Sequence, residues 1–331
     1  MSPIISKLAW KCAPFIALSL GLALTVWLVS TASVAAVAHS LGKVGWGAAV
    51  VVAVRATMIA INGIAWSRLL SKLSSAPVTA FLLARWIREA VDVLLPAAYI
   101  GGGLVGARIL TFWRTSTAVA FAGAVADLFL QTVAQALFAL LGAFLLLRIM
   151  EPGAVLPRLT LGLTIAVIAL GGFYAAQRYG GARLVDRALA ALSSRTTYGA
   201  KQIEPDFQIT MQTIWKNRRS PVLTSMLMHL CAWMFGTLEV WVTLYFMGWR
   251  ATLMQAVIIE SLGVSISIAA FIIPGSWGIQ EAGYILVGQM LGVPTQLSLT
   301  LSLVKRIPDF ALGIPGLVVW HAFEARRLLF G

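Results

Sequence analysis

The chain has 331 residues, of which 60% are hydrophobic and 11% are charged. A water-soluble domain averages about 25% charged residues, so this composition excludes an ordinary soluble protein and predicts an integral membrane protein. The net charge of +13 could indicate a nucleic-acid-binding protein, but the Lys and Arg residues are concentrated between apolar runs. That distribution is the positive-inside pattern of a multi-pass membrane protein, so we expect no nucleic-acid partner.

The first predicted element is the apolar run 14–38, which contains no charged residue. It exceeds the roughly 20 residues that cross a hydrocarbon core about 30 Å thick. Lys7 and Lys11 precede it, as in a secretory signal peptide, but the apolar region of a signal peptide is only ~7 to 15 residues long. We therefore favour an uncleaved first membrane helix, followed by a second span at 44–66.

The next segment, 81–96, differs because charged residues recur at helical spacing. Arg85, Arg88, Glu89 and Asp92 alternate with apolar side chains on the opposite face, which is typical of an amphipathic helix. We expect this helix to lie along the membrane surface. The glycine-rich stretch after it, up to residue 110, is too short for a full span.

Longer apolar spans are predicted at 117–147, 159–177, 222–247 and 251–273. The intervening segment 178–220 has eight basic residues and three acidic ones, which predicts a cytoplasmic location. The last three apolar pieces, 279–291, 295–304 and 308–323, are mostly below ~17 residues. Such lengths favour half-helices and re-entrant hairpins over simple crossings. The sequence therefore predicts an all-α polytopic membrane protein with a single domain, residues 1–331.

Two interrupted stretches are similar to each other. "LLPAAYIGGGLVGARIL" (94–110) and "IIPGSWGIQEAGYIL" (272–286) both place Pro after an aliphatic pair and then continue through a glycine-rich break. Corresponding interruptions in two halves are typical of inverted-repeat transporters, in which the broken helices meet at the substrate site. We expect repeat halves at about 1–177 and 221–331, joined by the basic segment 178–220. A chance match in a chain rich in Gly and Ala is the alternative.

Several ionisable side chains fall inside the predicted spans. Each of them would cost about 2.5 to 3.5 kcal/mol if it faced lipid. We expect these side chains to face the protein interior, either as structural contacts between helices or as parts of a substrate site. They are Arg55, Asp127, Glu239, Glu260 and Glu281.

Two of the acids are the strongest candidates for substrate contact. Asp127 begins a polar stripe that Gln131 and Gln135 continue at intervals of four residues. Glu281 follows the Pro-Gly break and has an amide neighbour and a tyrosine one turn away. The predicted substrate-binding residues of these two regions are Asp127, Gln280, Glu281 and Tyr284.

Arg108 and the neighbouring Lys305 and Arg306 are candidates for holding a phosphate headgroup, since a guanidinium binds phosphate through two hydrogen bonds. Ordinary positive-inside anchors are the alternative interpretation of these residues. The three histidines lack the spacing of metal ligands, and the G-x-G-x-x-G match at 101–106 follows no strand, so we predict neither a metal nor a cofactor. The sequence contains no Walker A loop and no G-x-S-x-G elbow, and we do not expect an enzyme.

The stretches "IPGSWGIQEAGYILVGQMLGVP" and "LSLVKRIPDFALGIPGLVVW" resemble the flippase-like family that includes the transmembrane region of lysylphosphatidylglycerol synthases. "REAVDVLLPAAYIGGGLVGARIL" and "DLFLQTVAQALFALLG" are similar to the hopanoid-biosynthesis-associated membrane proteins within it. In the lysyl-lipid enzymes a separate soluble domain transfers the aminoacyl group, so we expect no synthase activity from residues 1–331. The resemblance places the helix breaks at Pro96, Gly102, Gly103, Pro274, Gly275 and Gly278, and the acidic position at Glu281.

The resemblance implies movement of lipids between leaflets. We therefore expect a multi-pass protein of the bacterial inner membrane that moves a hopanoid or a related polyisoprenoid lipid. Its partners would be membrane lipids and, as further candidates, enzymes of hopanoid or lipid biosynthesis. The alternatives are a phospholipid flippase, and an integral membrane scaffold or enzyme in lipid biosynthesis.

Overall fold

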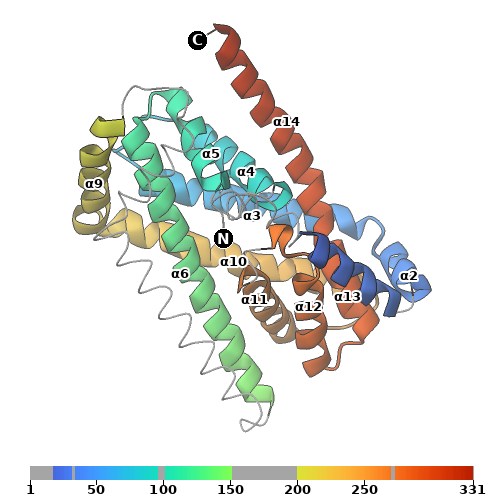
Figure 1. The fold of residues 1–331 in the computed structure, drawn as a ribbon. Coiled ribbons are helices and arrows are strands. Elements are labelled where there is room, and N and C mark those ends of the chain that lie inside the picture. The colour runs from blue at the N-terminus through green and yellow to red at the C-terminus, as the bar shows by residue number, and fades with distance from the viewer. Residues whose placement is uncertain (1–17, 32–33, 96–100, 151–199, 270–272, 331) are drawn as a thin grey trace, which may run out of the picture.

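The computed structural model describes residues 18–31, 34–95, 101–150, 200–269 and 273–330. Over these residues the protein consists of α-helices and two short 3-10 turns, and no β-strand is formed, which confirms the all-α prediction (Figure 1). The predicted span 159–177, the break residue Pro96 and the basic segment up to residue 199 lie outside the described residues.

Three helices are long and apolar enough to cross a membrane: α3 (Gly47–Leu69), α6 (Thr117–Ile149) and α10 (Arg219–Phe246). They match three of the predicted spans to within a few residues, so the protein is a multi-pass membrane protein. The predicted first span is not one straight helix. Its helices Leu18–Thr31 and α2 (Val34–Val44) lie at 96° to each other, and they count as a fourth crossing only if the bent pair is one broken span.

Shorter helices form two pairs that resemble the predicted interrupted segments. In the first half, α4 (Val78–Leu94) packs beside α5 (Gly101–Leu110). In the second half, α11 (Leu253–Ala269) packs beside α12 (Ile279–Met290), and the 3-10 turn η2 (Pro274–Ser276) lies between them in the chain. In each pair, the first helix is too short to be counted among the membrane spans, and the second helix packs back against it. Half-helices in transporters are arranged in this way.

The C-terminal part of the chain is more continuous than predicted. After α13 (Thr295–Val304), helix α14 (Arg306–Phe330) extends for 25 residues and protrudes from the bundle in Figure 1. Pro308 does not interrupt it, because the amides of the first helical turn have no intrahelical partner for a proline to remove. Pro315 lies inside the helix. Helix α6 protrudes at the opposite end of the bundle, and α9 (Ala200–Asn217) packs against it.

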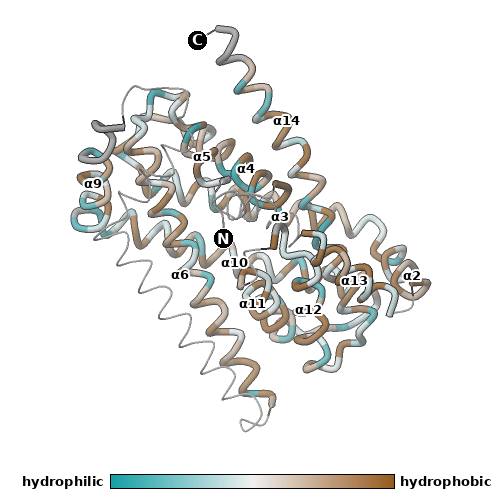
Figure 2. The backbone as a smooth tube through the Cα atoms, viewed as in Figure 1, coloured by the Kyte–Doolittle hydropathy of each residue, from teal (hydrophilic) through white to brown (hydrophobic). Residues whose placement is uncertain are grey.

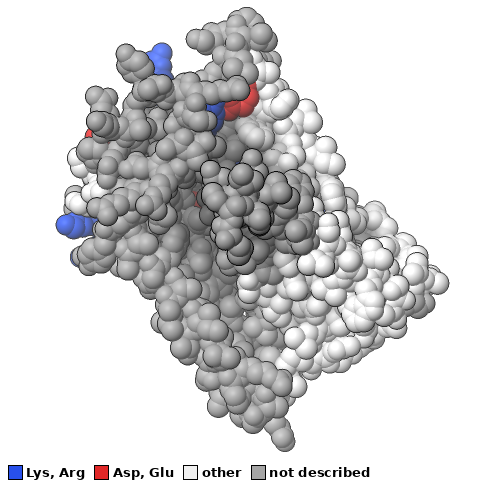
Figure 3. All heavy atoms as spheres, viewed as in Figure 1, with Lys and Arg blue, Asp and Glu red and all other residues white. Residues whose placement is uncertain are grey.

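The outer faces of the helices are apolar. On α6, Leu137, Leu141 and Phe144 are exposed, and Figure 2 shows hydrophobic residues along most of the bundle. On the face seen in Figure 3, the described surface over α2, α12 and α13 shows no charged side chain. This surface suits contact with lipid tails, whereas many charged side chains, such as Asp127, Glu239 and Glu260, are buried inside the bundle.

Candidate functional site

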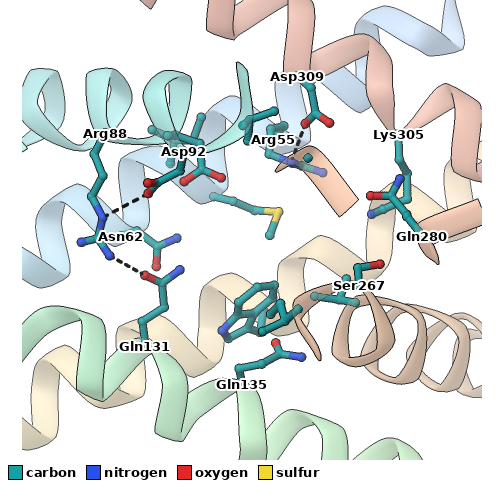
Figure 4. A pocket seen from close by; sticks show the side chains of 18 of the residues that line it. Arg55, Asn62, Arg88, Asp92, Gln131, Gln135, Ser267, Gln280, Lys305 and Asp309 are labelled. Atoms are coloured by element: carbon teal, nitrogen blue, oxygen red, sulfur yellow. Dashed lines mark hydrogen bonds and ion pairs between the residues drawn. The ribbon is translucent and has the colours of Figure 1, made fainter. Parts of the chain in front are cut away.

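A cavity of about 280 Å³ lies inside the bundle, between α3, α4, α6, α10, α11 and α12 and beside the junction of α13 with α14 (Figure 4). The charged side chains that line it are Arg55, Arg85, Arg88, Glu89, Asp92, Glu260, Lys305, Arg306 and Asp309. Its uncharged polar lining consists of Asn62, Gln131, Thr132, Gln135, Ser267, Gln280 and Tyr284. Charged and polar side chains from several helices thus converge on one chamber inside a bundle whose outer faces are apolar.

Helix α4 turns its charged face into this cavity. Arg85, Arg88 and Asp92 are 3%, 2% and 7% exposed, respectively. This corrects the expectation that the helix lies on the membrane surface, where its charges would meet water and headgroups. Amphipathic spacing shows that a helix has a polar face, but it does not show whether that face meets solvent or a buried polar chamber.

Asp127 of α6 lies behind the cavity lining, where its carboxylate contacts two arginines of α4 and one histidine of α10. Its Oδ2 accepts a hydrogen bond of 2.8 Å from Arg88 Nη1 and lies 3.8 Å from Arg85 Nη1. Its Oδ1 lies 3.1 Å from Nε2 of His229, whose Nδ1 is 2.7 Å from Asn62 Oδ1. Asp127 is fully buried and does not itself line the cavity. Its carboxylate therefore positions the two arginines.

The predicted polar stripe on α6 does reach the cavity. Gln131 Oε1 accepts hydrogen bonds from Arg85 Nη1 at 2.9 Å and Arg88 Nη2 at 3.5 Å. One turn further, Gln135 Nε2 donates to Ser265 Oγ at 3.1 Å. Both glutamines line the chamber, which places the polar side of an otherwise apolar span away from the hydrocarbon tails around the bundle.

A second charged cluster joins α3, α10, α11 and α13. Glu239 accepts two hydrogen bonds from Arg55, at 2.7 and 2.8 Å, and one of 2.6 Å from Lys305 Nζ. The same ammonium donates to both oxygens of Glu260, at 3.0 and 2.9 Å. The hydroxyl of Tyr284 donates to Glu260 at 3.0 Å. Two glutamates thus share one buried lysine.

The break before α12 is closed by Glu281 and Arg306. Glu281 Oε2 accepts a 2.6 Å hydrogen bond from the backbone N–H of Gly278, and its Oε1 accepts from Arg306 Nε and Nη2 at 3.2 and 3.1 Å. The Nη1 of Arg306 donates to the carbonyl of Gly275, and its guanidinium lies 4.2 Å from the ring centroid of Trp277. Glu281 is fully buried and faces the break, whereas Gln280 and Arg306 line the cavity.

Glycine is required at this break for conformational reasons. Gly275 and Gly278 have φ values of +63° and +78°, in the region that side chains with a Cβ rarely adopt. A Cβ at Gly278 would also lie 2.7 Å from the carbonyl oxygen of Gly21 and from Leu24 Cβ. These two glycines and Pro274 therefore produce the short turn that separates α11 from α12.

The first helix pair contains a comparable carboxylate contact. Asp92 Oδ1 accepts a 3.0 Å hydrogen bond from the backbone N–H of Gly102, at the start of α5, and Asp92 Oδ2 lies 3.7 Å from Arg88 Nε. Both breaks are thus followed by a glycine N–H bound to a carboxylate that is paired with an arginine. This likeness agrees with two repeated halves, although Asp92 precedes its break and Glu281 follows its own. The inverted repeat stays a prediction.

The predicted site residues fall into three groups. Gln280, Tyr284 and Arg306 line the cavity, and Asp127 and Glu281 lie behind it. Arg108 lies elsewhere: its side chain is 52% exposed and its Nε is 2.6 Å from Glu324 Oε1. Of the predicted break glycines, Gly102 and Gly103 are in the first turn of α5.

Sequence reasoning did not assign two groups of lining residues to the site. They are the α4 charges and Asp309, whose Oδ1 accepts a 3.1 Å hydrogen bond from Arg55 Nη1, whereas Lys305, predicted together with Arg306, does line the cavity. The signal for the first group was present in their helical spacing, but it was interpreted as a surface helix. Among the residues that the structure describes, no group of His, Cys, Asp and Glu could hold a metal ion.

An apolar helical bundle around a buried, charged chamber defines a multi-pass membrane protein with an internal polar site. Residues 15–316 match the family model described as the lysylphosphatidylglycerol synthase TM region, and the chain belongs to that family. This membership indicates a membrane protein of lipid-related function. Comparisons with curated proteins and with solved structures gave no match.

Proposed function

We propose that the protein is a lipid transporter that moves a lipid between the two leaflets of the bacterial inner membrane. The observation that carries this proposal is the charged cavity lined by α4 of the first helix pair and by both α11 and α12 of the second. Charged groups at membrane depth are costly and typically mark substrate pathways. Pro- and Gly-interrupted segments in the two halves are typical of transporters whose site lies between them.

In this mechanism the lipid headgroup enters the cavity while the tail stays against the apolar outer faces of the helices. Gln280, Tyr284 and Arg306 would contact the headgroup, because their side chains line the chamber. Asp127 and Glu281 would act from behind, by holding Arg88 and Arg306 in place. Exchange between conformations open to either leaflet would complete the transfer.

The proposed substrate is a hopanoid or a related polyisoprenoid lipid. Support for this class comes from the likeness of residues 88–110 and 127–142 to hopanoid-associated membrane proteins. Those two stretches contain Arg88, Asp92 and Gln131, which line the cavity. The family membership supports a lipid substrate in general, and it supports a phospholipid as well as it supports a hopanoid.

A scaffold or an enzyme of lipid biosynthesis is the competing proposal. An enzyme needs a base or nucleophile within reach of its substrate. Glu260, a carboxylate of the cavity wall, accepts hydrogen bonds from Lys305 and Tyr284, which favours binding over proton abstraction. A scaffold has no need for a chamber lined by nine charged side chains.

The test is transbilayer movement in liposomes that contain the purified protein. Labelled hopanoid, phospholipid and prenyl-phosphate probes would be placed in both leaflets, and the outer pool would be quenched chemically. Protein-dependent loss of the protected pool, fastest for the hopanoid probe, is expected. No movement of any probe above empty liposomes would contradict lipid transport, and movement of phospholipid alone would contradict the hopanoid substrate.

A further inference from the structure

Every cationic side chain that lines the cavity is already paired with a carboxylate. The closest N–O distances are 2.7 Å for Arg55–Glu239, 2.9 Å for Arg85–Glu89, 2.8 Å for Arg88–Asp127, 2.6 Å for Lys305–Glu239 and 3.1 Å for Arg306–Glu281. Within the described part of the chain the cavity therefore offers no unpaired cation to a ligand. Taking a carboxylate away from its buried partner is strongly unfavourable.

Carboxylates also outnumber the cations in this network. Seven carboxylates face five cationic side chains: Glu89, Asp92, Glu260 and Asp309 line the cavity, and Asp127, Glu239 and Glu281 stand directly behind it. The described lining itself has five cationic side chains and four carboxylates, so an anionic headgroup would have to compete for cations that are already occupied. A phosphate or carboxylate headgroup is therefore disfavoured, which argues against holding phosphate at Arg306.

Three buried polar atoms of the cavity wall have unmet hydrogen-bonding capacity. The Nε of Arg85 and the Nε of Arg88 are donors without a partner, and the Oε1 of Gln135 is an acceptor without one. Arg88 Nε is 3.7 Å from Asp92, too far for a hydrogen bond. These atoms have almost no accessible surface, so a ligand reaches them only when the side chains turn toward the cavity, and a complementary ligand would then supply acceptors near α4 and a donor near α6. A hydroxyl group supplies both.

The rest of the lining suits the same chemistry. Asn62, Thr132, Ser267 and Gln280 add neutral amide and hydroxyl groups, and the ring of Trp233 adds an aromatic wall. Hydroxyls can donate to paired carboxylates and accept from paired guanidinium groups without separating them, much as ordered water does. The volume of about 280 Å³ is near the lower end of the range for small-molecule sites, roughly 300 to 1,000 Å³, and suits a short headgroup.

We infer that the cavity binds an uncharged, hydroxyl-rich headgroup, a short polyol or a single sugar. This inference rests on the proposed lipid transport and names the headgroup that the transporter selects. A cationic headgroup would also be attracted by the carboxylates of the cavity, but it would leave the donors of Arg85 and Arg88 without acceptors. Preference for an amine is therefore an outcome that would overturn the inference.

The first test is binding of lipids that share one diacylglycerol tail to the detergent-solubilised full chain. Three of the lipids have glucose, phosphoglycerol or trimethylammonium as the headgroup, and the fourth is unmodified diacylglycerol. Kd is measured for each lipid. The glucosyl lipid is expected to bind at least about tenfold more tightly than the other three, since several neutral hydrogen bonds each contribute a few-fold. Equal or tighter binding of a charged lipid, or of unmodified diacylglycerol, would overturn the inference.

The second test removes the unmet acceptor. Gln135→Leu keeps the side-chain size, and Gln289→Leu is the matched control, because Gln289 is exposed on α12 and lies outside the cavity. Gln135→Leu is expected to weaken binding of the glucosyl lipid by about three- to tenfold and to leave diacylglycerol binding unchanged. An equal effect of both substitutions, or none, would count against the assigned contact. If the Gln135 variant does not fold, the headgroup series alone decides.

The liposome assay separates this inference from the proposed function. Tight binding of the glucosyl lipid without its transbilayer movement would leave the headgroup class standing and contradict transport. Movement that is faster for a charged headgroup than for the glucosyl lipid would leave transport standing and overturn the headgroup class.

Discussion

Lys305 Nζ lies 2.6 Å from Glu239 Oε2, and this contact joins the end of α13 to the C-terminal half of α10. Both side chains are almost fully buried, at 4% and 0% exposed. The same ammonium binds Glu260 of α11. One cation therefore balances the negative charge of carboxylates on two helices. Without Lys305, each of these buried carboxylates would lose a positively charged partner.

Replacing Lys305 by Met is expected to lower the free energy of unfolding by about 3 to 5 kcal/mol, because it leaves buried charge uncompensated. Adding Glu260→Gln should recover part of this loss, since Lys305 is the cation in direct contact with Glu260 in the described part of the chain. Denaturant unfolding in detergent would measure both effects. Lys43→Met, at an exposed position, is the control and should change stability little. A Lys305→Met protein as stable as the control would contradict this account of the network.

Replacing Arg306 by Lys keeps the charge but removes the guanidinium geometry. The pair of bonds to Glu281, the bond to the Gly275 carbonyl and the stacking on Trp277 cannot all be made by one ammonium. We expect a loss of about 1.5 to 3 kcal/mol in stability and a marked fall in lipid movement. Thermal unfolding and the liposome assay would measure these losses.

Arg108→Lys provides the comparison for that substitution. Arg108 also forms two hydrogen bonds to a glutamate, but its side chain is 52% exposed. Exposed ion pairs contribute only about 0 to 1 kcal/mol, so Arg108→Lys should be nearly neutral. Equal losses in the two variants would show that the geometry around Arg306 has no special importance.

Much of the fold was predictable from apolar length and from glycine and proline positions. The prediction 295–304 coincides with α13, and the predictions for α6 and α12 differ from the structure by only one or two residues at an end. These boundaries follow from local chemistry. Ser116 caps α6 by accepting a hydrogen bond from the Val119 N–H, and Pro294 precedes α13.

The pairing inside the cavity was not predictable in the same way. Arg55 and Glu239 are 184 residues apart in the chain, and Lys305 is 66 residues from Glu239. A sequence shows that buried charges need partners but not which ones, because the choice depends on how distant helices cross. For the same reason Glu281 was predicted to face the cavity, whereas it closes the break, and Arg108 was grouped with residues that it does not approach.

Neighbouring glycines at the start of α5 give opposite predictions. A Cβ at Gly102 would collide with the Arg88 carbonyl and the Asp92 carboxylate, whereas no atom of the described residues lies within 4 Å of a Cβ at Gly103. Gly102→Ala is expected to cost about 1 to 3 kcal/mol through overpacking. Gly103→Ala should stabilise α5 by up to about 1 kcal/mol, because alanine favours helix more than glycine does. Thermal unfolding of the two variants checks this, and destabilisation by both would contradict the close approach of α4 to α5.

The most direct test of the central claim is to fill the cavity and measure lipid movement in liposomes. Ser267 lines the chamber, whereas Thr57 is exposed on α3. The two positions are comparable because each hydroxyl donates a hydrogen bond to the carbonyl four residues earlier in its helix. Ser267→Phe should reduce the initial rate of lipid movement at least about tenfold, and Thr57→Phe should leave it unchanged, provided that both variants remain folded. If the folded Ser267→Phe protein moved lipid as fast as the Thr57→Phe control, the headgroup could not pass through this cavity.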